Sequence, residues 1–271
     1  MKNKINLGCG PIYVDSPDWL NLDFQSSGRA VRAANLLNGL PAQDESAKLV
    51  YSSHFLEHVP RGLISSVISE CFRVLAPGGV IRLVLPDLQN MAAEYLRCRL
   101  AGEHERADFV VLEMVDQCVR REPGGELGKY YQSIAVPRCR DSQSMIDYVA
   151  LRVGRAEVSA HPVKTAFSFG RLSAAVRSRI FELRVRLCLL GLPRAFKDQN
   201  VSMASLGERH HWLWDFHQLS GVLSAAGFSD AQVVTATTSR VADFPFQQLD
   251  VDNNGTPRKG LESMYVEACK Q

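Results

Sequence analysis

Long apolar runs are missing from this sequence. Nowhere do 18 apolar residues follow one another without interruption, which is about the length that a helix needs to cross a bilayer. The first ten residues, "MKNKINLGCG", also lack the apolar stretch of a secretory signal peptide. These absences argue against a membrane-spanning protein, and we expect a cytoplasmic one.

Paired cysteines and a surplus of charge are missing as well. The seven cysteines include no C-x-x-C pair, which disfavours a disulfide framework or a structural zinc site. The net charge is only +2, so no domain-wide basic surplus is available to neutralise nucleic-acid phosphates. We therefore expect neither a nucleic-acid partner nor a metal site.

A third glycine is missing from the loop "INLGCGP", residues 5–11. Gly8 and Gly10 follow a short apolar run, where bare backbone lets a ligand approach closely. The dinucleotide fingerprint requires another glycine three residues after the second one, but that position is Tyr13. The loop therefore indicates a cofactor site that is poorly suited to NAD.

Strand and helix patterns alternate at both ends of the chain. Strands are predicted at residues 4–8, 19–23, 48–53 and 80–86, and a helix is predicted within 60–79, where apolar residues recur at helical spacing. A second helix is predicted at 215–227, and two final strands at 231–238 and 263–270. With 271 residues and 46% apolar content, the chain can bury a full core, and the alternation predicts a parallel α/β sheet.

The alternation stops between residues 90 and 205, a stretch far too long for an ordinary connection. We predict a mainly helical insertion there, between core segments 1–89 and 206–271. Within it, residues 171–190 combine an apolar stripe with five arginines. Such a helix could lie on an anionic membrane surface, or it could be a lid helix with solvated arginines, which is the interpretation we favour.

The segments "INLGCGP", "WLNLDF", "YSSHFLEHV", "CFRVLAPGGVIRLVLPD" and "HHWLWDFHQLSGVLSAAGF" together resemble class I S-adenosylmethionine-dependent methyltransferases. They are most similar to the methyltransferase-11-like group, which is often found among enzymes of polysaccharide and glycan biosynthesis. The resemblance covers roughly residues 4–89 and 206–271. It implies a Rossmann-like fold of seven strands with S-adenosylmethionine as cofactor.

The resemblance also implies a set of cofactor-binding residues. Gly8 and Gly10, with their neighbours Leu7 and Cys9, would pack against the methionine part of the cofactor. Asp23 ends the second predicted strand, where a carboxylate can accept hydrogen bonds from both ribose hydroxyls. The remaining members would be a pair beside the adenine and a pair near the sulfonium: Asn35 and Leu36, then Ser53 and His54.

The stretch "HFLEH", residues 54–58, also matches the inverted zinc peptidase motif H-x-x-E-H. Two histidines four residues apart on a helix can share a metal while a glutamate activates water. That motif needs a long helix, whereas here it follows a predicted strand and Pro60 comes two residues later. We therefore treat zinc hydrolysis as the least favoured function, and assign Leu56, Glu57 and His58 mainly structural roles.

Methyl transfer needs little catalytic machinery beyond alignment of the acceptor, although a hydroxyl acceptor gains from a general base. The candidate bases are His54, Asp87 and His211, with His210 beside the last. Asp215 stands three residues before Gln218, which predicts a helix cap.

We therefore expect an enzyme that O-methylates a sugar, a glycan or another small hydroxyl acceptor, with the insertion forming the acceptor pocket. The alternative is a noncatalytic relative in a biosynthetic pathway. It is motivated by Asn6 and Asn35, which occupy positions that are often acidic in the family.

Overall fold

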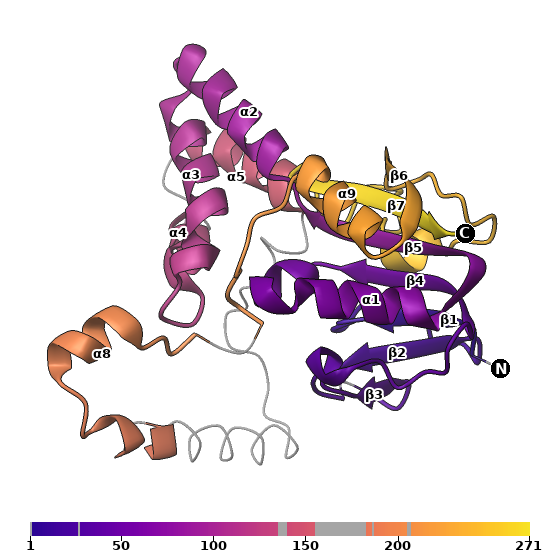
Figure 1. Cartoon of the computed structure of the whole chain (residues 1–271). Helices are drawn as coiled ribbons and strands as arrows, with labels where there is room; N and C mark the ends of the chain where they lie inside the picture. The colour runs from indigo at the N-terminus through magenta and orange to yellow at the C-terminus, as the bar shows by residue number, and fades with distance from the viewer. Residues whose placement is uncertain (1, 27, 135–139, 155–182, 186, 205–206) are drawn as a thin grey trace.

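The computed structural model describes residues 2–26, 28–134, 140–154, 183–185, 187–204 and 207–271. Its centre is a sheet of seven strands in the order β3-β2-β1-β4-β5-β7-β6 (Figure 1). All pairs among β1 to β5 are parallel, whereas β7 runs antiparallel to β5 and β6. The strands are β1 Lys4–Leu7, β2 Trp19–Asp23, β3 Val31–Ala33, β4 Ala47–Ser53, β5 Leu75–Pro86, β6 Phe228–Val234 and β7 Ser263–Lys270. The predicted seven-stranded Rossmann-like fold is confirmed.

Each face of the sheet has its own apolar core, because successive strand residues point to opposite sides. Val50 faces the helices α1 Ile64–Val74 and α9 Phe216–Ala225, which cover one face. Its neighbours Leu49 and Tyr51 face the segment that contains the short helix α10 Phe246–Leu249. The sheet is therefore enclosed on both sides, as a largely parallel sheet requires.

Several boundaries differ from the prediction. The short strand β3 was not predicted, and three residues are too few to show a period. β5 begins at Leu75, five residues earlier than expected, because residues 76–79 form an irregularity in its pairing with β4. β6 begins at Phe228 and ends at Val234, so the predicted strand at 231–238 was placed too late. No helix separates β1 from β2, since residues 8–18 form turns and bends; this agrees with the short spacing between Gly10 and β2.

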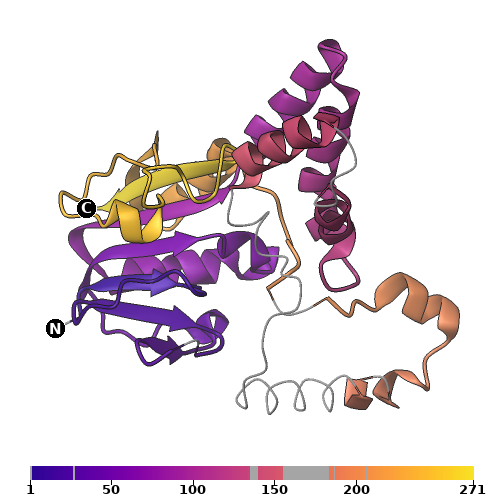
Figure 2. The ribbon, with the colours of Figure 1, turned by 180° about the vertical axis from the view of Figure 1, so that it is seen from behind.

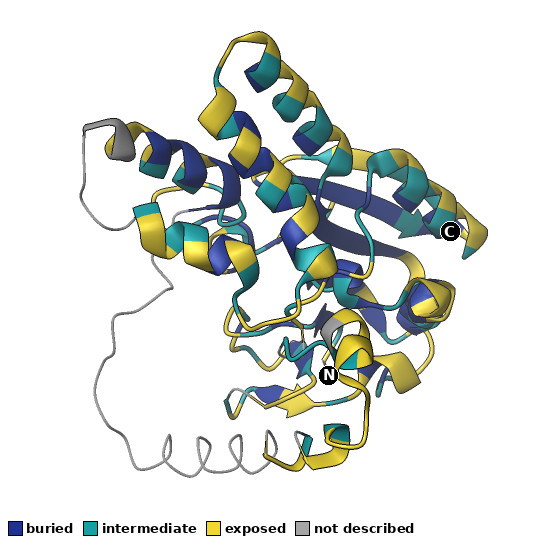
Figure 3. Cartoon of the chain, turned by 90° about the vertical axis from the view of Figure 1, so that its left-hand side faces the viewer, coloured by how far each residue is buried: buried dark blue, intermediate teal, exposed yellow. Residues whose placement is uncertain are grey.

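The segment after β5 forms a helical layer with a core of its own. It contains α2 Leu88–Leu100, α3 His104–Val119, α4 Gly125–Ile134 and α5 Arg140–Val153. Apolar residues from all four helices pack together, and Arg152 of α5 forms a buried ion pair with Glu113 of α3 at 2.9 Å. Figure 2 shows these helices at one end of the sheet, and Figure 3 shows buried residues on one side of them and exposed residues on the other.

Later in the insertion the structure describes α8 Arg194–Asn200. Most of residues 171–190, where we considered a basic amphipathic helix, lie outside the described residues. Among the helices that the structure describes, none has the length and apolar character needed to cross a membrane.

Candidate active site

The two glycines of the first loop have left-handed backbone conformations, with φ of 61° at Gly8 and 51° at Gly10. A Cβ at Gly8 would lie 2.7 Å from the Phe55 ring, so this glycine makes room for a side chain of the protein. A Cβ at Gly10 would have no described atom within 4 Å. Our expectation that both glycines face a ligand therefore fits the surroundings of Gly10 better than those of Gly8.

Asp23 links the end of β2 to this loop. Its Oδ2 accepts a hydrogen bond from the Gly10 N–H at 2.7 Å, and the side chain is only partly buried. Cys9 is buried between the two glycines, where burial and the Asp23 carboxylate raise the pKa of the thiol to about 12. Cys9 is therefore a neutral space-filling thiol, while the Asp23 carboxylate remains accessible at the edge of the sheet.

The other proposed cofactor residues lie at the ends of neighbouring strands. Leu7 is the buried last residue of β1, and Ser53 is the last residue of β4. Asn35 caps the short helix η1 Leu36–Asn38, with its side-chain oxygen accepting the Leu37 N–H at 3.1 Å. Leu36 itself is buried in the core. In a parallel sheet the carboxyl ends form the ligand crevice, and the order β3-β2-β1-β4 brings these residues to that edge.

His54 follows β4 in a strained left-handed conformation, with φ of 50°. Its backbone N–H donates to the Val84 carbonyl at 2.9 Å, and its Nε2 lies 2.9 Å from the Ser263 hydroxyl. Its Nδ1 lies 3.3 Å from Glu57 Oε1. Burial, assisted by the positive charge of Lys259, holds the pKa of His54 well below its usual value. His54 is thus a neutral imidazole held from both ends.

Residues 54–58 do not form the long helix that the zinc peptidase motif requires. They consist of the left-handed His54, Phe55 and the single turn η2 Leu56–His58, followed by a second such turn, η3 Arg61–Leu63. The two histidines of the motif are therefore not presented on one face of an α-helix. The geometry disfavours the hydrolase function.

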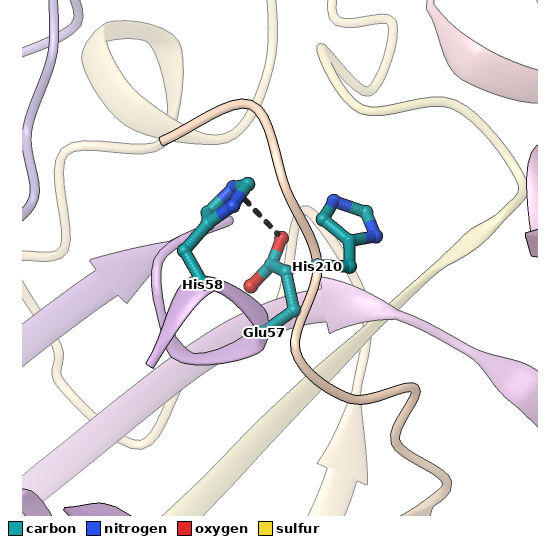
Figure 4. A group of neighbouring side chains, drawn as sticks. All are labelled: Glu57, His58 and His210. Atoms are coloured by element: carbon teal, nitrogen blue, oxygen red, sulfur yellow. Dashed lines mark ion pairs between the residues drawn. The ribbon is translucent and has the colours of Figure 1, made fainter. Parts of the chain in front are cut away.

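Glu57 and His58 instead meet His210, which arrives from the segment before α9 (Figure 4). One ligand atom from each of the three side chains lies within 4.8 Å of the others. Burial raises the pKa of Glu57 to about 8 and lowers the pKa of His210 to about 3. From the sequence we predicted a mainly structural role for Glu57 and did not predict this cluster, although "HFLEH" and "HH" are the two most histidine-rich stretches quoted above.

A cavity of about 310 Å³ opens beside these histidines, between the sheet and the helical layer. Residues at the sheet edge line one side: His54, His58, Pro86, Gly207, His210, Lys259 and Glu262. The other side is lined by residues of α3, its C-cap Arg120, α4 and α5: Glu113, Gln117, Arg120, Leu127, Tyr131 and Val153. The sequence analysis did not find Lys259, Glu262 or the helix residues, because none of them belongs to a motif.

Of the three candidate bases, His54 lines the cavity, whereas Asp87 and His211 are not among its described lining residues. Asp87 caps α2, with its Oδ1 accepting the Gln89 N–H at 3.0 Å. His211 has an exposed side chain, and its backbone N–H donates to the Glu57 carbonyl at 2.7 Å. Asp215 caps α9 as predicted, accepting the Gln218 N–H at 2.7 Å.

Comparison with known proteins identifies a protein family that part of this chain resembles. Residues 16–83 match the family model described as a methyltransferase domain, Methyltransf_11. This segment runs from just before β2 into β5, so it includes Asp23 and His54 but not β1 or the Gly8–Gly10 loop. Within residues 16–83 the chain therefore carries a methyltransferase domain of the class I S-adenosylmethionine-dependent type. It is accordingly an enzyme, and its cofactor is S-adenosylmethionine.

Solved structures similar to this methyltransferase include three other S-adenosylmethionine-dependent methyltransferases. The Archaeoglobus fulgidus structure is 11% identical, with 99% of this chain and 86% of that chain covered and a TM-score of 0.40. The Thermotoga maritima structure is 10% identical, with 99% and 82% covered and a TM-score of 0.39. The Mesorhizobium loti structure is 13% identical, with 99% and 90% covered and a TM-score of 0.38. No curated protein matches the chain.

Proposed function

We propose that this methyltransferase acts on a hydroxyl group of a polar acceptor of the sugar or glycan class. The observation that carries the proposal is the cavity of about 310 Å³ with its polar and charged lining. Hydroxyl-rich molecules offer donors and acceptors for carboxylates, imidazoles and guanidinium groups alike. The volume is at the lower end for a ligand pocket, which favours one sugar ring or a similarly small group.

In this proposal the cofactor lies along the ends of β1 to β4. The residues present fit it, because Gly10 leaves its backbone open and the Asp23 carboxylate can accept ribose hydroxyls. Leu7, Gly8, Cys9, Asn35, Leu36, Ser53 and His54 complete the proposed set. When bound, S-adenosylmethionine supplies an activated methyl group on its sulfonium.

The insertion, residues 90–205, would close over the acceptor and leave the core, residues 1–89 and 206–271, to bind the cofactor. Helices α3 to α5 supply half of the cavity wall, so the acceptor would be held between the two parts. Such enclosure excludes water and fixes the reacting groups in line, which is the main demand of methyl transfer. His54 lines this cavity with its two ring nitrogens facing Ser263 and Glu57, so it would position the acceptor by shaping the wall at the sheet edge.

The first test is calorimetric titration with S-adenosylmethionine. We expect Asp23→Ala to weaken binding on the order of ten- to a hundredfold, because a charge-assisted hydrogen bond is lost. Asp23→Asn keeps an oxygen for the Gly10 N–H and separates loss of the loop contact from loss of charge. Asp18→Ala, an exposed aspartate just before the other end of β2, is the matched control and should bind as wild type.

The acceptor class is tested with S-adenosylmethionine carrying a labelled methyl group. Monosaccharides and oligosaccharides are compared with amines and thiols of similar size, and label transferred to each is counted. Transfer to sugars, reduced at least tenfold by His54→Gln, is the expected result. Transfer confined to amines or thiols would refute the acceptor class, and binding without any transfer would favour the noncatalytic alternative.

A further inference from the structure

Glu57 carries a buried carboxyl group whose oxygens make no hydrogen bond to another described residue. The residue as a whole is 0% exposed, and neither side-chain oxygen has a hydrogen-bond partner among the described residues. Two imidazole nitrogens lie beside Oε1, with His54 Nδ1 at 3.3 Å and His58 Nε2 at 4.0 Å. A buried carboxylate left in this state is costly, so the position calls for a proton or a cation.

His58 turns a lone pair toward that carboxylate. Its Nδ1 lies 2.9 Å from the Arg209 carbonyl oxygen, which can only accept, so Nδ1 carries the ring proton. Nε2 is then the unprotonated nitrogen and faces Glu57 Oε1. Two lone pairs pointing at each other repel unless a proton or a metal ion lies between them. A histidine that donates its other N–H to a backbone carbonyl is the usual arrangement of a metal ligand.

His210 supplies a second imidazole to the same place. It is 5% exposed, and its Nδ1 is buried without a partner within the described part of the chain. Its ring meets the His58 ring edge-on, with centroids 4.9 Å apart. Figure 4 shows the carboxylate of Glu57 and the two rings gathered at the segment that carries His210.

We propose that Glu57, His58 and His210 bind a divalent transition-metal ion, for which zinc fits the donor set best. Two imidazole nitrogens and one carboxylate oxygen are a known zinc ligand set that leaves a coordination position open. Ligand atoms around tetrahedral zinc lie roughly 3.4 Å apart, so the present spread of 4.8 Å closes with side-chain shifts of about an ångström.

The metal would cross-link two segments that are far apart in the sequence. His58 belongs to the turn after β4, and His210 belongs to the segment that leads into α9. Both residues line the cavity, so the bound ion would hold one wall of it in place. This inference goes beyond the proposed function, because the site can bind metal whether or not the acceptor is a sugar.

The test uses the full-length protein stripped of metal by a chelator and then titrated with Co²⁺ and with Zn²⁺. Cobalt bound by imidazole and carboxylate absorbs visible light, which reports ligation directly, and elemental analysis gives the zinc stoichiometry. We expect one ion per chain and a rise in melting temperature of about 5 °C or more at a hundredfold excess of metal over its Kd. Glu57→Gln and His210→Gln should weaken binding roughly a hundredfold or more.

The matched control is His217→Gln, an exposed histidine on α9, which should bind metal as wild type. S-adenosylmethionine titration and circular dichroism of the same samples show whether each variant is folded. Because cobalt absorption is independent of methyl transfer, failure of this inference and failure of the proposed function give different results.

Absence of saturable binding by the wild-type protein would overturn the inference, whatever the behaviour of the variants. So would a cobalt spectrum that is unchanged in both Glu57→Gln and His210→Gln. Either result would leave a proton between Glu57 and His54 as the means by which the buried carboxyl group is neutralised.

Discussion

At the scale of single residues, the first loop shows two different uses of glycine. Gly8 is required by packing, since any side chain there would strike Phe55. Gly10 has open space instead, and its N–H is held by Asp23. A residue whose Cβ would meet nothing in the protein, at the edge where cofactors bind, is a position that a ligand can approach.

The prediction for Gly10→Ala is a loss of cofactor affinity that exceeds its loss of stability. The left-handed conformation should cost an alanine about 1 kcal/mol of unfolding free energy. If the cofactor lies against this backbone, S-adenosylmethionine binding should weaken tenfold or more. Gly78→Ala is the control, because φ is 78° there and no described atom lies within 4 Å of its Cβ. Equal binding by both variants would place the cofactor away from Gly10.

At the scale of elements, acidic residues cap helices or hydrogen-bond within them: Asp87 caps α2, and Glu70 of α1 accepts several hydrogen bonds. Asp87 is the N-cap of α2 and directly follows β5, so it joins the sheet to the helical layer. Burial raises the pKa of Asp87, while two backbone N–H groups and Arg152 oppose that shift. These contacts make Asp87 the cap of α2, whereas from the sequence we predicted it as a candidate base.

Substitution separates the two roles of Asp87. Asparagine caps helices about as well as aspartate but cannot accept a proton as a carboxylate does. We expect Asp87→Asn to keep both stability and methyl transfer, and Asp87→Ala to lose about 1 kcal/mol of unfolding free energy. A folded Asp87→Asn protein that binds S-adenosylmethionine but transfers no methyl group would instead identify Asp87 as a base.

A second element-scale prediction concerns α1 and pH. Glu70 accepts hydrogen bonds from Arg73 Nη2 at 2.7 Å and from the Leu40 N–H at 2.8 Å, which lower its pKa from 4.5 to about 2. Because the folded-state pKa is the lower one, this stabilisation is complete above pH 4.5 and disappears as pH falls toward 2.

Urea unfolding of wild type and Glu70→Gln across this pH range checks the prediction. The advantage of wild type should be constant above pH 4.5 and should shrink below it. The exposed Glu105 provides the control substitution, Glu105→Gln, for which we expect no such trend. A constant difference down to pH 2.5 or so would show that Glu70 stabilises α1 without its charge.

At the scale of the whole molecule, a buried charge network joins the sheet to the segment that covers its second face. Arg82 of β5 is 0% exposed and donates to Asp250 at 2.8 Å and to Glu267 of β7 at 2.8 Å. It also donates to the Thr235 and Thr238 carbonyls. Tyr51 of β4 completes the network by donating to Asp250 at 2.7 Å.

Arg82→Met should therefore destabilise the protein by about 3–5 kcal/mol, because two buried carboxylates lose their counter-charge. The loss should appear as a lower urea midpoint with an unchanged slope. Arg32→Ala, an exposed arginine of the edge strand β3, should change the unfolding free energy by no more than about 0.5 kcal/mol. A small effect of Arg82→Met would mean that the carboxylates take up protons or water when the arginine is absent.

The sequence by itself determined most of the local elements. Apolar spacing predicted β1, β2, β4, α1 and α9, and the Asp215 cap was read from a four-residue pattern, because each of these depends on neighbours along the chain. Gly10 and Asp23 also lie together as the sequence predicts, since strand ends in a parallel sheet share one edge, and their contact with the cofactor stays a prediction.

Only the tertiary structure decided which residues line the cavity and what surrounds Glu57. His58 is hydrogen-bonded to the Arg209 carbonyl although the two residues are 151 positions apart in the chain. Lys259, from just before β7, lines the same cavity as His58. The physical reason is that burial and charge pairing depend on which distant segments pack together. The spacing of residues along the chain does not show which distant segments become neighbours. The stretch "HFLEH" could therefore suggest a metal motif, but it could not show that His210 lies beside Glu57 and His58.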